Sequence, residues 1–191
     1  DVETWFADGV LAFVPSDSLL QVLERDAPDT AWPNKEAPLL QYEFANYFQR
    51  HGLLDEITTL TREVLSGLAE GEYFYAVGLN GKIRFALEMP REQVQRIEEE
   101  TGRRLPRANH AFLFPGEPVL TAGAFFVERS PEARIAAVNT QSGHYFYSNV
   151  SPTVREDISV RSDRYLLTVG HFFKALDREG ICHEGVLVSK M

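Results

Sequence analysis

The fold is decided by the stretch Tyr73-Phe74-Tyr75-Ala76-Val77-Gly78-Leu79-Asn80-Gly81-Lys82-Ile83-Arg84-Phe85-Ala86-Leu87. Two runs rich in aromatic and β-branched residues, 73–77 and 82–87, flank the dipeptide Asn80-Gly81. Asn-Gly between two such runs is a strong hairpin signal, because both residues tolerate the positive φ angles of a tight turn. The sequence therefore predicts a β-hairpin over residues 73–87 with a two-residue turn.

Beyond this hairpin, the pattern predicts further strands and then a helix. Apolar runs separated by turn-forming residues predict strands over 110–114, 119–128 and 134–147. Gly123 lies inside the middle run, where a glycine indicates a bulge or a close approach of another backbone segment. Apolar residues at helical spacing over 165–176 predict a terminal helix that ends at Gly180, and a short strand follows at 186–188.

Residues 1–71 are predicted to be mainly helical, with helices over 39–51 and 56–69. Apolar residues recur there at three- and four-residue spacing, which places them on one face of each helix. The side chains expected to bury against the sheet are Leu40, Phe44, Phe48, Ile57, Leu60 and Leu68. A further short, exposed helix is predicted between Pro90 and Gly102.

This order of elements predicts the α+β class, with an antiparallel β-meander and with N-terminal helices and a C-terminal helix packed on it. Residues 1–71 would form the helical N-terminal region, and residues 72–191 would form the sheet domain that carries the candidate site. We expect the two regions to make one compact unit.

Composition excludes several classes of protein. The 191 residues are 44% hydrophobic and 25% charged, the ordinary globular range, and the net charge of −9 argues against nucleic-acid binding, which needs a cationic surface. The single cysteine rules out an intrachain disulfide and a Cys-rich zinc site. Apolar runs fall short of the ~20 residues of a membrane-spanning helix. The chain begins at Asp1 without a Met or a hydrophobic leader, which we interpret as an excised domain of undetermined localisation.

A functional site is predicted where the alternation of polar and apolar residues breaks down. Asn139 opens such a stretch, which continues through Ser142-Gly143-His144-Tyr145. His144 and the upstream His110 are candidate general acid and base, and we predict that they share one site. The alternative is a structural pair of histidines, each hydrogen-bonded to the backbone at the ends of its strand.

The neighbouring residues are candidates for ligand binding. Ser142 and Gly143 would make a tight backbone feature whose N–H groups bind an anion or a carbonyl oxygen, rather than a serine nucleophile. Tyr145 and Tyr147 would share one face of the strand and stack on a planar ligand, unless they are core residues. Glu128, together with Glu117 in a turn, is the candidate for a catalytic carboxylate.

No metal or phosphate site is predicted. The histidines at 110, 144, 171 and 183 lack the spacing of a metal-binding pair, and no glycine-rich phosphate loop occurs, so the cofactor stays open. Cys182 and His183 are adjacent and would point to opposite faces of a strand, so they cannot pair as nucleophile and base. A pairing of Cys182 with His110 or His144 stays open, but we expect Cys182 to be a buried, inert thiol.

The two histidine segments resemble a domain shared by plant IQ-motif calmodulin-binding proteins and bacterial secreted proteins of effector or toxin type. Residues 73–180 correspond to it, with Ala111-Phe112 where the family has two serines and Tyr147 where it usually has proline. No IQ motif occurs, so calmodulin binding is not implied. The resemblance is carried by His110, Leu113, Gly116, Val119, Ala122, Gly123, Ser142, Gly143, His144 and Tyr145.

The resemblance implies a shared fold and a secreted effector- or toxin-type protein. With the candidate site, it predicts a transferase or hydrolase that acts on a nucleotide-like or peptide ligand at a strand-end pocket. ADP-ribosyltransferases offer an analogy, because they also place a His at a strand start beside aromatic residues. The alternative is a non-enzymatic interaction module whose apolar helices at 39–68 dock a host protein. Oligomeric state stays open.

Overall fold

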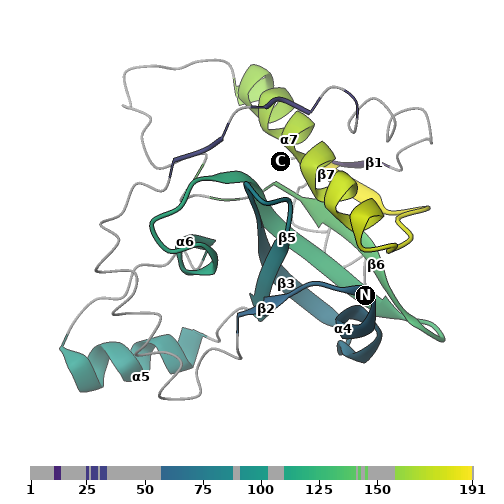
Figure 1. Ribbon diagram of the computed structural model, residues 1–191. Helices are drawn as coiled ribbons and strands as arrows, with labels where there is room; N and C mark the ends of the chain where they lie inside the picture. Colours follow the sequence, from purple (N-terminus) through teal and green to yellow (C-terminus); the bar gives the residue numbers. More distant parts are fainter. Residues whose placement is uncertain are drawn as a thin grey trace.

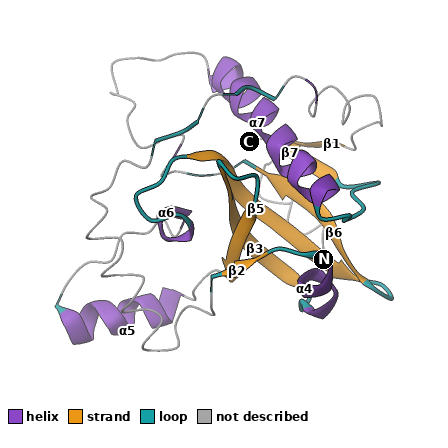
Figure 2. Cartoon of the chain, in the orientation of Figure 1, coloured by secondary structure: helices purple, strands orange, loops and turns teal. Residues whose placement is uncertain are grey.

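The computed structural model describes residues 11–13, 25, 27–29, 31–33, 57–87, 91–102, 110–140, 142, 145 and 158–190. Its centre is a seven-stranded sheet in the order β1-β7-β6-β5-β3-β4-β2 (Figures 1 and 2). Neighbouring strands are antiparallel except β6 and β7, which are parallel. The strands are β1 (Leu11–Phe13), β2 (Thr58–Thr59), β3 (Gly71–Gly78), β4 (Ile83–Leu87), β5 (Val119–Arg129), β6 (Ala133–Asn139) and β7 (Leu187–Lys190).

The hairpin of β3 and β4 confirms the prediction for residues 73–87, but its loop is one residue longer than predicted. Gly78 N–H donates to the Lys82 carbonyl at 3.0 Å, so three residues, 79–81, connect the last bonded pair. Gly81 N–H closes the turn onto the Gly78 carbonyl at 2.9 Å, and Gly81 has φ +73°. This is the three-residue loop in which a glycine occupies the left-handed region, so Asn80-Gly81 marks the hairpin without fixing its length.

Strands β5 and β6 confirm the strands predicted over 119–128 and 134–147, but they end at other residues than predicted. β5 covers Val119–Arg129, and residues 130–132 join it to β6. β6 ends at Asn139, so the predicted continuation to residue 147 is wrong: Tyr145 has helical backbone. At that point the Asn139 side chain, instead of a further strand residue, takes the Ala124 N–H at 2.9 Å, and the ladder stops.

The predicted strand over 110–114 is also wrong, because this segment is the short helix α6 (His110–Leu113). Arg84 of β4 donates from Nη1 to the Leu113 carbonyl at 3.0 Å, and its guanidinium lies 4.6 Å from the centre of the Phe114 ring. Four or five apolar residues fit a strand or a buried helical turn equally well, and here contacts with β4 select the helix.

The long helix α7 (Ile158–Arg178) lies between β6 and β7 in the sequence and covers one face of the sheet (Figure 1). It confirms the predicted terminal helix, and the predicted strand after it is β7. On this face Phe172 packs against Tyr75 and Phe125, with ring centres 4.4 and 5.9 Å apart. Phe74 points to the opposite face, since neighbours in a strand alternate, and it meets the ring of His110 there at 5.6 Å.

The described residues of 1–71 complete both edges of the sheet. β1 pairs with β7 and β2 pairs with β4. The helix predicted over 56–69 is wrong in extent: β2 comes first, and α4 (Arg62–Gly67) is short and capped by Thr61, whose Oγ1 accepts the Val64 N–H at 3.2 Å. The predicted helix over 39–51 lies outside the described residues, with Leu40, Phe44 and Phe48.

The remaining predictions for apolar residues are confirmed in part. Leu60 is fully buried in the core, Leu68 packs against it in a partly buried position, and Ile57 is half-buried. The helix predicted between Pro90 and Gly102 is α5 (Arg91–Thr101). Among the described residues, no helix is both long enough and apolar enough to cross a membrane.

Candidate functional site

Polar side chains are buried where the ends of β5 and β6 approach α7. A polar group in the interior costs free energy unless it has a hydrogen-bond partner, so each of these residues requires one. The buried polar residues among those described are Thr121, Asn139, Thr140, Ser142, Thr168 and His171. All lie in β5, α7 or the segment from the end of β6 onward, which makes this region the candidate site.

Asn139 connects three strands at this point. Its Oδ1 accepts the Ala124 N–H of β5 at 2.9 Å, and its backbone carbonyl accepts the hydroxyl of Tyr75 in β3, also at 2.9 Å. Burial raises the pKa of Tyr75 far above its usual range, although a hydrogen bond with Thr121 acts in the opposite direction. Tyr75 therefore remains a neutral hydroxyl that donates to Asn139. The predicted site residue Asn139 is thus a structural link between strands β3, β5 and β6.

A second buried contact ties the sheet to α7. The hydroxyl groups of Thr121 and Thr168 are 2.8 Å apart and both side chains are fully buried. Thr121 lies two residues before Gly123 and shares its face of β5. Neither threonine was predicted as a site residue, because an isolated threonine in a strand or helix carries no distinctive sequence signal.

His110 is held from the opposite face of the sheet. Its Nε2 lies 2.8 Å from the Gly123 carbonyl oxygen. A carbonyl oxygen only accepts, so Nε2 carries the proton and donates it, and Nδ1 is the basic nitrogen of the neutral ring. The side chain is half-buried, and the edge-on contact with Phe74 fixes the ring plane at 76° to that aromatic ring.

Ser142 and Tyr145 lie inside the molecule. Both are fully buried, and the Tyr145 N–H donates to Ser142 Oγ at 3.4 Å. This contact engages the Ser142 hydroxyl with the backbone of a residue three positions later in the chain. Gly143, His144 and Tyr147 lie outside the described residues, so a site shared by His110 and His144 stays a prediction.

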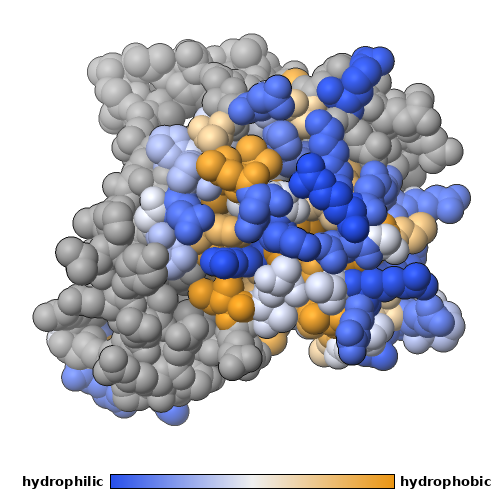
Figure 3. Space-filling view, viewed as in Figure 1, coloured by the Kyte–Doolittle hydropathy of each residue, from blue (hydrophilic) through white to orange (hydrophobic). Residues whose placement is uncertain are grey.

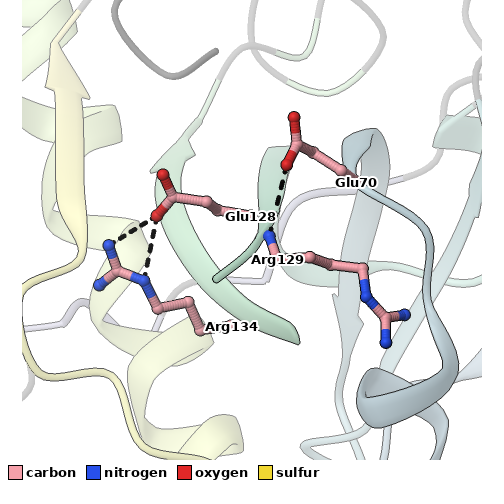
Figure 4. A network of polar contacts seen from close by, with 4 residues as sticks. All are labelled: Glu70, Glu128, Arg129 and Arg134. Carbon is pink, nitrogen blue, oxygen red and sulfur yellow. Dashed lines mark hydrogen bonds and ion pairs between the residues drawn. The ribbon is translucent and has the colours of Figure 1, made fainter. Parts of the chain in front are cut away.

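Glu128 lies near the C-terminal end of β5 and contacts Arg134 (Figure 4). Its Oε2 accepts from Arg134 Nε at 3.1 Å and from Nη2 at 2.6 Å, and both side chains are partly exposed. The backbone N–H of the next residue, Arg129, donates to Glu70 Oε2 at 3.4 Å. Five residues along a strand correspond to ~17 Å, so Glu128 and the Gly123 carbonyl that holds His110 are far apart. The described contacts of Glu128 are those of a surface ion pair.

His171 joins α7 to an N-terminal segment that crosses the end of the sheet. Its Nε2 donates to the Pro28 carbonyl at 2.6 Å. A few residues later Trp32 exchanges two backbone hydrogen bonds with Val119 of β5, at 2.7 and 3.0 Å. Burial lowers the pKa of His171, and the cations Lys174 and Arg178 lower it further, whereas the Pro28 hydrogen bond and Asp29 raise it.

His171 should make the free energy of unfolding depend on pH. Its pKa is lower in the folded state than its ordinary 6.5, so the unfolded chain binds the proton first on acidification. Stability is then complete above pH 6.5 and is lost as the pH falls toward the folded pKa. Urea unfolding of wild type and His171→Gln at pH 7.5 and 5.5 checks this, and the wild type should lose more stability. An equal loss in both proteins would contradict it.

The remaining candidates form no site among the described residues. Cys182 is exposed, so the prediction of a buried thiol is wrong. His183 Nε2 lies 2.9 Å from Asp177 Oδ1, which gives this imidazole a carboxylate partner in α7. In the described part of the chain, no group of three or more His, Cys, Asp or Glu side chains is arranged to hold a metal ion.

Comparisons with known proteins found no match for this chain. No protein-family model, no curated protein and no solved structure matches the chain. The site therefore has to be interpreted from its own geometry.

Proposed function

We propose that this chain is an effector- or toxin-type domain that acts as a transferase or hydrolase on a nucleotide-like or peptide ligand, with His110 as its acid–base group. The observation that supports this most is the 2.8 Å hydrogen bond from His110 Nε2 to the Gly123 carbonyl. An acid–base imidazole needs one nitrogen anchored, so that the other is presented in a defined direction and protonation state.

The surroundings of His110 support the same role. The side chain is half-buried, so solvent and a ligand can reach it, and contacts with Phe74 and the Gly123 carbonyl restrict its rotation. In the proposal, the imidazole of His110 takes a proton from the attacking group of the ligand and returns it to the leaving group. In the same proposal, Gly143 and Tyr147 of the segment after β6 hold the ligand and His144 is the second titrating group, whereas Ser142 and Tyr145, which are buried, support this segment from inside.

The choice of reaction stays at the level of transferase or hydrolase. The analogy with ADP-ribosyltransferases depended on a His at a strand start, and His110 lies in helix α6. The analogy also required a nearby glutamate, and the described contacts of Glu128 are with Arg134 at the far end of β5. We therefore assign no carboxylate to the reaction.

The test is the variant His110→Gln, assayed with a panel of nucleotides (NAD⁺, ATP, GTP) and a mixed peptide library by mass spectrometry. The Gln amide can still donate to the Gly123 carbonyl, so the anchor is kept and only the titrating group is lost. Turnover should fall by ~10²–10⁴-fold, the usual contribution of a general acid or base. His183→Gln is the matched control, because it removes an imidazole whose partner is Asp177 of α7, and it should retain wild-type turnover.

Equal turnover by wild type and His110→Gln would refute the role of His110. Absence of turnover and of binding across the panel would favour the alternative, an interaction module that uses the segment 39–68.

Part of the segment 39–68 packs in the core and is not available to a partner, since Leu60 and Leu65 are buried. The large exposed hydrophobics among the described residues are Leu79 (58%) and Leu87 (46%), and polar residues separate the apolar ones on the α7 face (Figure 3).

A further inference from the structure

We propose that Asn139 and Tyr75 are positioning residues, which act on His110 through the peptide unit between Gly123 and Ala124. The importance of this arrangement for catalysis rests on the function proposed above. The arrangement itself is a property of the folded chain and can be measured without a substrate.

Both hydrogen bonds that matter engage one and the same peptide unit. Its carbonyl oxygen, that of Gly123, accepts from His110 Nε2 at 2.8 Å. Its N–H, that of Ala124, donates to Asn139 Oδ1 at 2.9 Å. His110 lies 29 residues before Asn139 in the sequence, yet a single amide group separates their side chains.

A peptide unit that is bonded at both ends is polarised. When its N–H donates to Asn139, electron density moves toward the Gly123 oxygen, which becomes a better acceptor for the imidazole N–H. A stronger bond holds the His110 ring more firmly and keeps the proton on Nε2. Asn139 therefore sets the orientation and tautomer of an imidazole that its side chain reaches only through this amide.

Two further features keep Asn139 in place. The buried Tyr75 hydroxyl donates to the Asn139 carbonyl at 2.9 Å, and its raised pKa keeps it protonated. Gly123 has no side chain, and a Cβ there would lie 2.0 Å from the Asn139 carbonyl oxygen. The end of β6 can therefore lie directly against β5. This close approach is required for the Asn139 side chain to reach the Ala124 N–H.

The experiment follows the Hε2 proton of His110 by NMR in protein labelled with ¹⁵N-histidine. In wild type we expect a downfield Hε2 signal that exchanges slowly with water. Asn139→Leu removes the acceptor at similar size, so the signal should move upfield and exchange faster, by less than the ~tenfold that the loss of one whole net hydrogen bond would give. Asn139→Asp retains an acceptor at Oδ1 and should keep the slow signal. Tyr75→Phe removes only one hydroxyl group, and it replaces Asn139→Leu as the test if that variant does not fold. Its Hε2 signal should change in the same direction.

Tyr73→Phe is the matched control. It removes a tyrosine hydroxyl from the same strand, one that donates to the Ala69 carbonyl at 2.9 Å and not to Asn139. Its Hε2 shift and exchange rate should stay close to wild type. The proposal is overturned if Hε2 is unchanged in Asn139→Leu and Tyr75→Phe, or if Tyr73→Phe accelerates exchange as much as they do.

These outcomes are separate from those of the activity test. If His110→Gln remains fully active while Hε2 responds to Asn139 as expected, the positioning stands and the catalytic role fails. If His110→Gln is inactive and the Hε2 shift and exchange rate do not change in Asn139→Leu, the catalytic role stands and the positioning fails.

Discussion

Replacement of Phe125 by Ala is expected to lower the free energy of unfolding by ~3–5 kcal/mol, the usual cost of removing a large aromatic side chain from a packed core. Phe125 is fully buried in the middle of β5. Its ring centre lies 5.5 Å from that of Tyr73, 5.7 Å from Phe85 and 5.9 Å from Phe172. This side chain thus contacts β3, β4 and α7. Its removal leaves a cavity that the surrounding rings cannot fill, because they belong to three different elements.

Urea unfolding followed by circular dichroism measures this difference, with equal slopes required for the comparison. Leu79→Ala is the control, because this apolar side chain lies in the exposed β3–β4 loop and its removal should change stability by less than ~0.5 kcal/mol. A loss under ~1 kcal/mol for Phe125→Ala would mean that α7 does not press on this face of the sheet.

Local patterns were sufficient for the elements whose signal lies in neighbouring residues. Asn80-Gly81 predicted the hairpin of β3 and β4, and apolar runs between turn-forming residues predicted β5 and, except for its end, β6. Helical spacing and a terminal glycine predicted α7. Each of these depends on periodicity or turn chemistry within a window of ten to twenty residues, which is the range in which sequence patterns are informative.

Elements fixed by distant contacts could not be predicted in this way. The helical form of α6 depends on Arg84, which binds its last carbonyl from β4. The end of β6 depends on the side-chain contact of Asn139 with Ala124. β2 interrupts the predicted helix over 56–69 because Thr58–Thr59 pairs with β4. In all three cases a partner far away in the sequence decides a choice that the local pattern leaves open.

The candidate site was predicted only in part for a similar reason. His110 and Asn139 were recognised as unusual polar residues, but their partners are backbone groups of Gly123 and Ala124, which carry no sequence signal. Tyr75 reads as an ordinary aromatic strand residue. The one trace of this arrangement in the sequence is Gly123, since a glycine inside a strand indicates a close backbone approach, and that approach is found.

Replacement of Gly123 by Ala is therefore expected to have the second large effect. The new Cβ would lie 2.0 Å from the Asn139 carbonyl oxygen and 2.8 Å from its carbon. The obstacle is backbone rather than a flexible side chain, so β5 and the end of β6 must separate. Overpacking costs ~1–3 kcal/mol where side chains can adjust, and we expect the upper end of this range or more here. Thermal and urea unfolding measure the loss.

Gly67→Ala is the matched control, because a Cβ at the last residue of α4 meets no atom within 4 Å. The same substitution should there be neutral or stabilise by up to ~1 kcal/mol, since alanine favours helix. The two variants thus add the same methyl group and should change stability in opposite directions. If Gly123→Ala is as stable as wild type, the end of β6 does not lie against β5. That result would also refute the contacts of Tyr75 with Asn139 and of Asn139 with the peptide unit bound by His110.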